Sequence, residues 1–155
     1  MKLPAADMSS YFRFVPLVLV CVMLSGCGDG RGARVPVSGM VTIDGEPLQH
    51  GSVTFVPVKI AGAAARAGGG SIDEQGRFSV SSYTPNDGLL PGKYQVMVGS
   101  AEPLGETAQR WHAPKKYANM KTSGFEIEVA GGMEELKFEL SWEGEKHSEP
   151  FVEKF

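Results

Sequence analysis

The feature that most constrains the fold of this sequence is an alternation of apolar with polar or flexible side chains in residues 71–98. A period of two residues places successive side chains on opposite faces of a β-strand, so each half of this stretch predicts a half-buried strand. The apolar side chains predicted to face inward are Phe78, Val80, Tyr94, Val96 and Val98. The stretch therefore predicts a β-sandwich module.

Turn-forming residues separate these strands and recur along the chain. Asp73 and Gly76 predict a turn, because an aspartate side chain binds nearby backbone and glycine adopts positive φ. Pro91 and Gly92 predict a second turn. The chain has 155 residues with 20 glycines and 10 prolines, and no stretch keeps a helical period. These features predict one all-β domain with many short strands.

Further alternating segments lie on both sides of this stretch. Residues 35–43 place valines on one face, and the Asp44-Gly45 pair that follows is a strong hairpin signal. Residues 51–57 predict another strand, and residues 125–129 and 136–140 predict the last hairpin. The predicted core consists of Val37, Val41, Val53, Phe55, Phe78, Val80, Tyr94, Val96, Phe125, Ile127, Phe138 and Leu140.

The N-terminus has the three parts of an export signal. Lys2 and Arg13 precede 11 apolar residues at 14–24, and small residues follow at 25–26. A helix of about 11 residues, at about 1.5 Å per residue, reaches about half of a bilayer core of roughly 30 Å. A transmembrane helix is therefore the weaker interpretation, and a buried segment of the domain is the other alternative. We predict a signal peptide at residues 1–26.

The end of the apolar run, Leu24-Ser25-Gly26-Cys27, resembles the lipobox of bacterial lipoproteins. The resemblance implies cleavage before Cys27, acylation of the Cys27 thiol, and a mature protein held in a bilayer by several acyl chains. Each buried methylene contributes about 0.8 kcal/mol, so several chains give stable anchoring.

Residues 28–34 predict a short, flexible, glycine-rich tether between Cys27 and the domain. In proteobacterial sorting, an aspartate directly after the lipidated cysteine retains a lipoprotein in the inner membrane. Gly28 holds that position here, and Asp29 comes one residue later. This favours delivery to the outer membrane, facing the periplasm.

The domain itself resembles the carboxypeptidase regulatory-like domain, a transthyretin-type (prealbumin-like) β-sandwich of about seven strands. The segments that carry this resemblance are residues 37–48, 51–55, 73–78 and 91–96. Together with the lipobox, further segments are similar to small envelope lipoproteins abundant in planctomycetes, namely residues 114–117, 122–124 and 138–140. The resemblance implies a single seven-stranded transthyretin-like β-sandwich at residues 35–142, followed by a charged C-terminal tail at residues 143–155. It implies no catalytic or ligand residue.

Two connections between the predicted strands differ in composition from the rest. Residues 59–70 are rich in alanine and glycine, which predicts a mobile loop. Residues 99–123 form the longest connection without strand signals, and long loops are often functional. We therefore take Trp111, His112 and Tyr117 as the candidate contact surface.

The aromatic residues of this second connection have two interpretations. Together with Trp142, they would form a platform for a glycan or peptide, because flat rings stack on sugar faces and anchor interfaces. Alternatively, Trp111 and Tyr117 pin the connection to the sandwich, and we favour this interpretation because a long loop needs apolar anchors. Residues 101–109 offer little to bury, so we expect them to be mobile.

Charge and residue chemistry argue against several functions. A formal net charge of −3 offers no basic surface for nucleic acid. His50, His112 and His147 lie far apart without metal-ligand spacing, and the only two cysteines, Cys21 and Cys27, provide no disulfide framework. No nucleophile, base and orienting group occur in a catalytic pattern, so we expect no enzyme, no metal and no cofactor.

We therefore expect a membrane-anchored, non-catalytic binding or structural module of the bacterial cell envelope. Its expected partners are membrane lipid, through acylated Cys27, and a protein or glycan that the sequence does not identify. The alternative is a carbohydrate-binding or enzyme-accessory module that uses residues 99–123.

Overall fold

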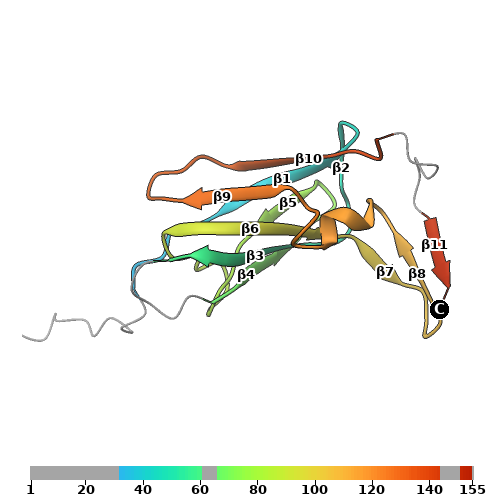
Figure 1. Cartoon of the computed structure of the whole chain (residues 1–155), viewed down its shortest axis with the longest axis horizontal. Helices are drawn as coiled ribbons and strands as arrows, with labels where there is room; N and C mark the ends of the chain where they lie inside the picture. The colour runs from blue at the N-terminus through green and yellow to red at the C-terminus, as the bar shows by residue number, and fades with distance from the viewer. Residues whose placement is uncertain (1–31, 61–65, 144–150, 155) are drawn as a thin grey trace, which may run out of the picture. The chain divides into compact units, whose positions relative to one another are not determined.

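The computed structural model describes residues 32–60, 66–143 and 151–154. Every described strand lies in the unit Ala33–Phe155. The predicted signal peptide and Cys27 lie outside the described residues. The described chain is all-β, as predicted, with three sheets and one short 3₁₀ helix (Figure 1). It contains no helix that is long and apolar enough to cross a membrane.

The first sheet is organised around β1 (Ser38–Ile43). β10 (Leu136–Leu140) pairs with one edge of β1 in parallel, and β2 (Glu46–Pro47) and β5 (Arg77–Ser79) pair antiparallel with its other edge. Asp44 and Gly45 join β1 to β2 with φ angles of 47° and 90°. Positive φ at both central residues is the geometry of a two-residue hairpin turn, so the hairpin predicted from Asp44-Gly45 is confirmed.

The second sheet has the strand order β4-β3-β6-β9 and is antiparallel throughout. Its strands are β3 (Ser52–Lys59), β4 (Gly68–Ser71), β6 (Gly92–Gly99) and β9 (Phe125–Val129). β4 lies partly in the segment 59–70 that the sequence predicts as a loop, and residues 61–65 are outside the described residues. A glycine-rich strand has no alternation of apolar and polar side chains from which it could be predicted, so only its pairing with β3 identifies it.

The predicted last hairpin, residues 125–129 with 136–140, is wrong in its pairing. β9 pairs with β6, whereas β10 pairs with β1, so these consecutive strands lie in different sheets. Both strands exist where alternation predicts them. Alternation defines which face of a strand is apolar but not which strand is its neighbour, and the connection between β9 and β10 crosses from one sheet to the other.

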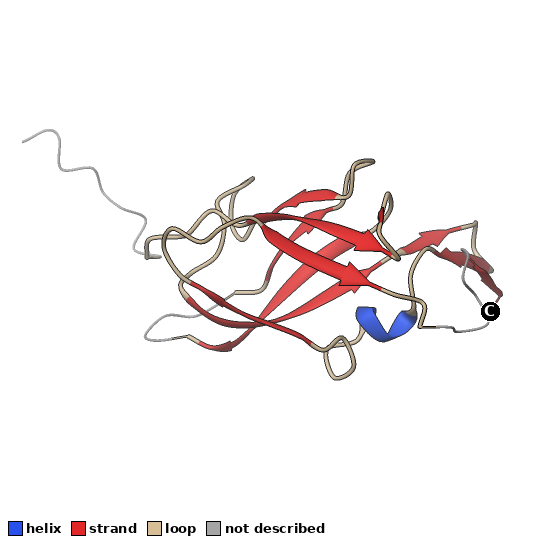
Figure 2. Ribbon diagram, turned by 90° about the horizontal axis from the view of Figure 1, so that it is seen from above, coloured by secondary structure: helices blue, strands red, loops and turns tan. Residues whose placement is uncertain are grey.

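A third, smaller sheet has the order β11-β8-β7, from β7 (Ala101–Pro103), β8 (Ala108–Trp111) and β11 (Phe151–Lys154). The expectation that residues 99–123 lack strands is therefore wrong, and β11 extends the fold beyond the predicted boundary at Trp142. The described chain has eleven strands rather than the predicted seven. None of the described residues of the third sheet is fully buried, so its sequence shows no apolar alternation. The 3₁₀ helix η3 (Lys115–Ala118) lies toward this end of the sandwich (Figure 2).

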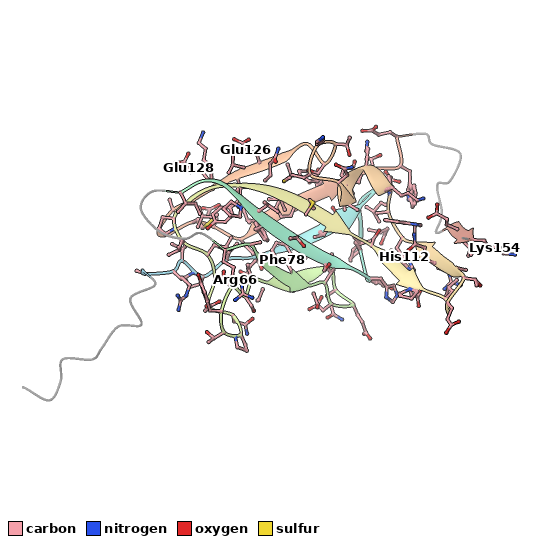
Figure 3. All side chains as sticks on the ribbon, turned by 60° about the horizontal axis from the view of Figure 1, so that its bottom comes forward. Arg66, Phe78, His112, Glu126, Glu128 and Lys154 are labelled. Atoms are coloured by element: carbon pink, nitrogen blue, oxygen red, sulfur yellow. The ribbon has the colours of Figure 1, made fainter. Side chains whose placement is uncertain are left out.

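Phenylalanine rings fill the space between the two larger sheets. Phe78 of β5 is labelled in Figure 3. Its ring centroid lies 6.1 Å from that of Phe55 on β3 and 5.9 Å from that of Phe138 on β10, so the three rings join these strands. Gly39 on β1 makes this packing possible, because a Cβ atom there would lie 2.6 Å from Cζ of Phe78. The absence of a side chain on one inward-facing position thus admits a large ring from the neighbouring strand.

The predicted core is largely confirmed. Every predicted core residue is buried except Phe125 and Ile127, which are half-buried and pack against the core. The alternation identifies these faces correctly because the side-chain period of a strand is two. Some buried residues lie in the connections outside the strands, where alternation does not predict them. They are Leu48, Ile72, Leu89, Ala113 and Trp142.

The start of the domain is held against the loop that precedes β6. Val35 and Leu89 form a β-bridge, and Arg34 Nε lies 3.0 Å from Asp87 Oδ2. The Asp87 carboxylate also accepts hydrogen bonds from the backbone N–H groups of residues 82–84. Burial raises the pKa of Asp87, but these hydrogen bonds and Arg34 outweigh it and lower that pKa. The chain therefore enters the sandwich at a fixed place.

Phe78→Ala should lower the free energy of unfolding by about 3 to 5 kcal/mol, because it removes a ring that is 4% exposed and leaves a cavity between the sheets. Val58→Ala is the control, because Val58 is 57% exposed, and it should change stability by less than about 0.5 kcal/mol. Urea unfolding measures both. A loss below about 1 kcal/mol for Phe78→Ala would show that this ring does not organise the core.

Candidate binding surface

The third sheet lies at the end of the sandwich opposite the start of the domain. Val35 bridges Leu89, which comes shortly before β6, whereas β7 begins directly after β6 ends. A strand of 8 residues such as β6 spans about 26 Å, at about 3.3 Å per residue. The first described segment, drawn in blue, and the third sheet accordingly lie at opposite ends of the sandwich in Figure 1. We call the end with the third sheet the distal end.

A cluster of two histidines and a glutamate lies at the distal end. The ring centroids of His50 and His112 are 4.5 Å apart, with 35° between the ring planes. Nε2 of His112 lies 3.0 Å from Oε2 of Glu102, and Arg110 Nη1 donates to the same oxygen at 3.3 Å. The hydrogen bond with His112, assisted by the charge of Arg110, lowers the pKa of the Glu102 carboxyl.

The sequence does not predict this cluster. His50 and His112 are 62 residues apart in the sequence, without the spacing of metal ligands, yet their rings lie together in the structure. His50 precedes β3 and His112 follows β8, and the pairing of β3 with β6 brings these two places to one end. No local pattern carries that information. His147 lies outside the described residues.

Two open grooves adjoin the histidine pair. One has a volume of about 410 Å³ and is lined by residues that include Asp44, Glu46, His50, His112 and Trp142. The other has a volume of about 460 Å³ and is lined by residues that include His50, Gly99, Glu102 and Pro103. His50 lines both grooves. The distal end therefore offers concave surfaces that combine rings with carboxylates.

Trp111 is half-buried and is held by the C-terminal strand. Its Nε1 donates to Oε2 of Glu153 at 3.1 Å, and Gln109 Nε2 donates to the same atom at 2.9 Å. Lys115 Nζ donates to the other oxygen, Oε1, and also lies 5.4 Å from the centroid of the indole ring. The Lys115 hydrogen bond, followed by those from Gln109 and Trp111, lowers the pKa of Glu153 to about 2.

Tyr117, the third candidate contact residue, packs on the sandwich instead of facing solvent. It is 6% exposed, and its ring stacks on Phe125 with centroids 5.6 Å apart. Its hydroxyl accepts a hydrogen bond from the backbone N–H of Ser141 at 3.1 Å. This is the geometry of a loop anchor. Trp142 is also buried, at 4% exposure, so neither ring offers an open face to a ligand.

A larger groove of about 860 Å³ runs along the side of the sandwich, between the edges formed by β4 and β5. Its lining is mostly hydroxyl side chains and glycine backbone, from Ser38, Ser52, Thr54, Gly69, Gly70 and Ser79 among others. The two sheets approach closely here, since Gly69 forms a β-bridge with Ser81. The serine side chains alternate with core residues along their strands, so this groove follows from the exposed faces of the sheets.

No known protein family, curated protein or solved structure matches this chain. Among residues 32–60, 66–143 and 151–154, no three His, Cys, Asp or Glu side chains form a group that could hold a metal ion.

We expect the Glu153 carboxyl to titrate near pH 2 in the folded chain, well below its ordinary value of 4.5. Because the folded pKa is depressed, the hydrogen bonds of Glu153 stabilise β11 fully above about pH 4.5, and this stabilisation is lost as the pH falls through about 2. Carboxyl NMR shifts measure the titration. Lys115→Ala should raise the pKa of Glu153, and an unshifted pKa in the native chain would contradict the contact with Lys115.

Proposed function

We propose that this protein is a lipid-anchored β-sandwich of the bacterial envelope that acts as a non-catalytic binding or structural module. The proposed anchor is acylated Cys27, and the proposed membrane is the outer membrane, with the domain facing the periplasm. The proposed fold family is the transthyretin-like carboxypeptidase regulatory-like domain. The facing sheets of the all-β structure support this assignment.

The observation that carries the proposal is the position of the distal end relative to the start of the domain. Arg34, seven residues after Cys27, is tied to Asp87 at one end of the sandwich. The third sheet, His50 and His112 lie at the other end. A seven-residue tether reaches at most about 25 Å. A domain anchored in this way keeps one end near the bilayer and leaves the distal end available to a partner.

The distal end also has the composition of a binding surface. Its grooves bring together rings and carboxylates, from His50, His112 and Glu102. Aromatic rings are enriched in interfaces because they combine a large apolar area with polar atoms. Arg110 and Glu102 pair with each other, so the surface is polar without a large excess of one charge.

Cys27→Ser should abolish lipidation, because Cys27 is the last cysteine of the chain and the one at the predicted cleavage site. The variant should appear as an unprocessed or soluble protein when membranes are fractionated, whereas the native protein should be in the membrane pellet. Cys21→Ser is the matched control and should leave the native protein in the pellet. A Cys27→Ser protein that remains membrane-bound at the mature mass would refute the anchor.

A carbohydrate-binding role is the second candidate, and the groove of about 410 Å³ favours it. Ring faces of His50 and His112 can stack on a sugar, and the carboxylates of Asp44 and Glu46 can accept hydrogen bonds from its hydroxyls. In this second proposal, the sugar contacts residues 99–123 through His112 and not through Tyr117.

For this second role, His112→Ala should reduce glycan-array binding at least about tenfold, since it removes one ring of the groove. Lys137→Ala, on the exposed face of β10, should leave the signal unchanged. Equal signals for the two variants would exclude this groove as a sugar site.

A further inference from the structure

The C-terminal strand β11 is attached to the domain like a bound peptide. It pairs antiparallel with β8 from Phe151↔Trp111 to Lys154↔Ala108, and among the described strands it pairs with β8 alone. Val152 is 49% exposed, and neither Glu153 nor Lys154 is buried. Through residues 152–154, whose side chains are described, β11 makes a strand addition to the β8 edge without entering the core.

One side chain of β11 is recognised individually. Three donors converge on the Glu153 carboxylate: Gln109 Nε2 at 2.9 Å, Trp111 Nε1 at 3.1 Å, and Lys115 Nζ. Gln109 and Trp111 lie two residues apart on β8, so their side chains share one face of that strand, and Lys115 comes from η3. Hydrogen bonds to an ionised acceptor are stronger than neutral ones, so this trio selects a carboxylate at one register position.

β11 can leave this site at low cost to the rest of the fold. It is short, half-exposed, and joined to the sandwich through residues 144–150. Elements with few buried apolar contacts open locally while the core stays folded. When β11 is displaced, β8 presents backbone N–H and C=O groups beside the three side-chain donors. This is the arrangement by which a sheet edge binds an extended peptide.

We propose that the β8 edge, together with Gln109, Trp111 and Lys115, is a binding site for an extended acidic segment of a partner protein. β11 occupies this site in cis and competes with the partner. The partner segment adds as a strand antiparallel to β8 and places a glutamate opposite Gln109, as β11 does with Glu153. An acidic partner is supported by the positive charge of Lys115 and by the hydrogen bond that the indole N–H of Trp111 can donate to a carboxylate. This inference names the partner class of the proposed binding module and rests on that proposal.

The test measures binding of a fluorescent peptide with the sequence of residues 149–155 to the full-length chain in detergent, by anisotropy. Glu153→Lys places a lysine beside Lys115, which should detach β11 and open the site. The peptide should therefore bind the Glu153→Lys chain at least about tenfold more tightly than the native chain, in which β11 competes at a high effective concentration. Glu139→Lys makes the same charge change on β10 and should bind as the native chain does.

Specificity for the carboxylate is tested in the Glu153→Lys chain. A peptide with glutamine in place of Glu153 should bind about tenfold more weakly, and a second change, Lys115→Ala, should weaken the native peptide by a similar factor. Hydrogen exchange of β3 and β6 amides shows that each variant keeps its sandwich. Absence of peptide binding to a folded Glu153→Lys chain, or equal binding of the two peptides, overturns the inference. Either result leaves the Cys27 anchor untouched, because fractionation tests that separately.

Discussion

The packing of Phe55, Phe78 and Phe138 between the two larger sheets is the interaction on which the rest of the structure depends. These rings come from β3, β5 and β10, which are distant in the sequence, and their contacts bring the strands into one core. Because Gly39 has no side chain, the Phe78 ring can pack against β1 at this position. β1 then pairs on both edges, with β10 in parallel on one and with β5 antiparallel on the other.

The distal end is held together by different forces from those of the core. The third sheet adds few buried apolar side chains, and its strands are linked by backbone pairing and by the polar contacts of Glu102 and Glu153. Such contacts are individually modest and depend on solvent and charge, whereas buried rings resist opening. The sandwich can therefore stay folded while the distal end exchanges one strand for another, which is the property that the proposed binding function requires.

The two ends of the sandwich are suited to different tasks. At the start, Arg34 and Asp87 form an ion pair within a loop whose backbone N–H groups also bind the Asp87 carboxylate, and this fixes where the chain enters. At the distal end, His50 and His112 lie between open grooves. In the proposed anchored protein, the Arg34–Asp87 ion pair would orient the domain on its tether to lipidated Cys27, and the grooves at the distal end would contact a partner.

The sequence by itself determined the faces of the core strands and the Asp44-Gly45 hairpin, because side-chain period and turn chemistry are local properties. It located β9 and β10 but paired them wrongly, and it missed β7, β8 and β11, whose polar residues show no apolar alternation. Only the tertiary structure decided which edges meet, and thereby placed His50 beside His112 and Glu153 among its three donors. The physical reason is that backbone pairing between distant polar strands depends on the packed core that aligns them. No local pattern of side chains determines that pairing.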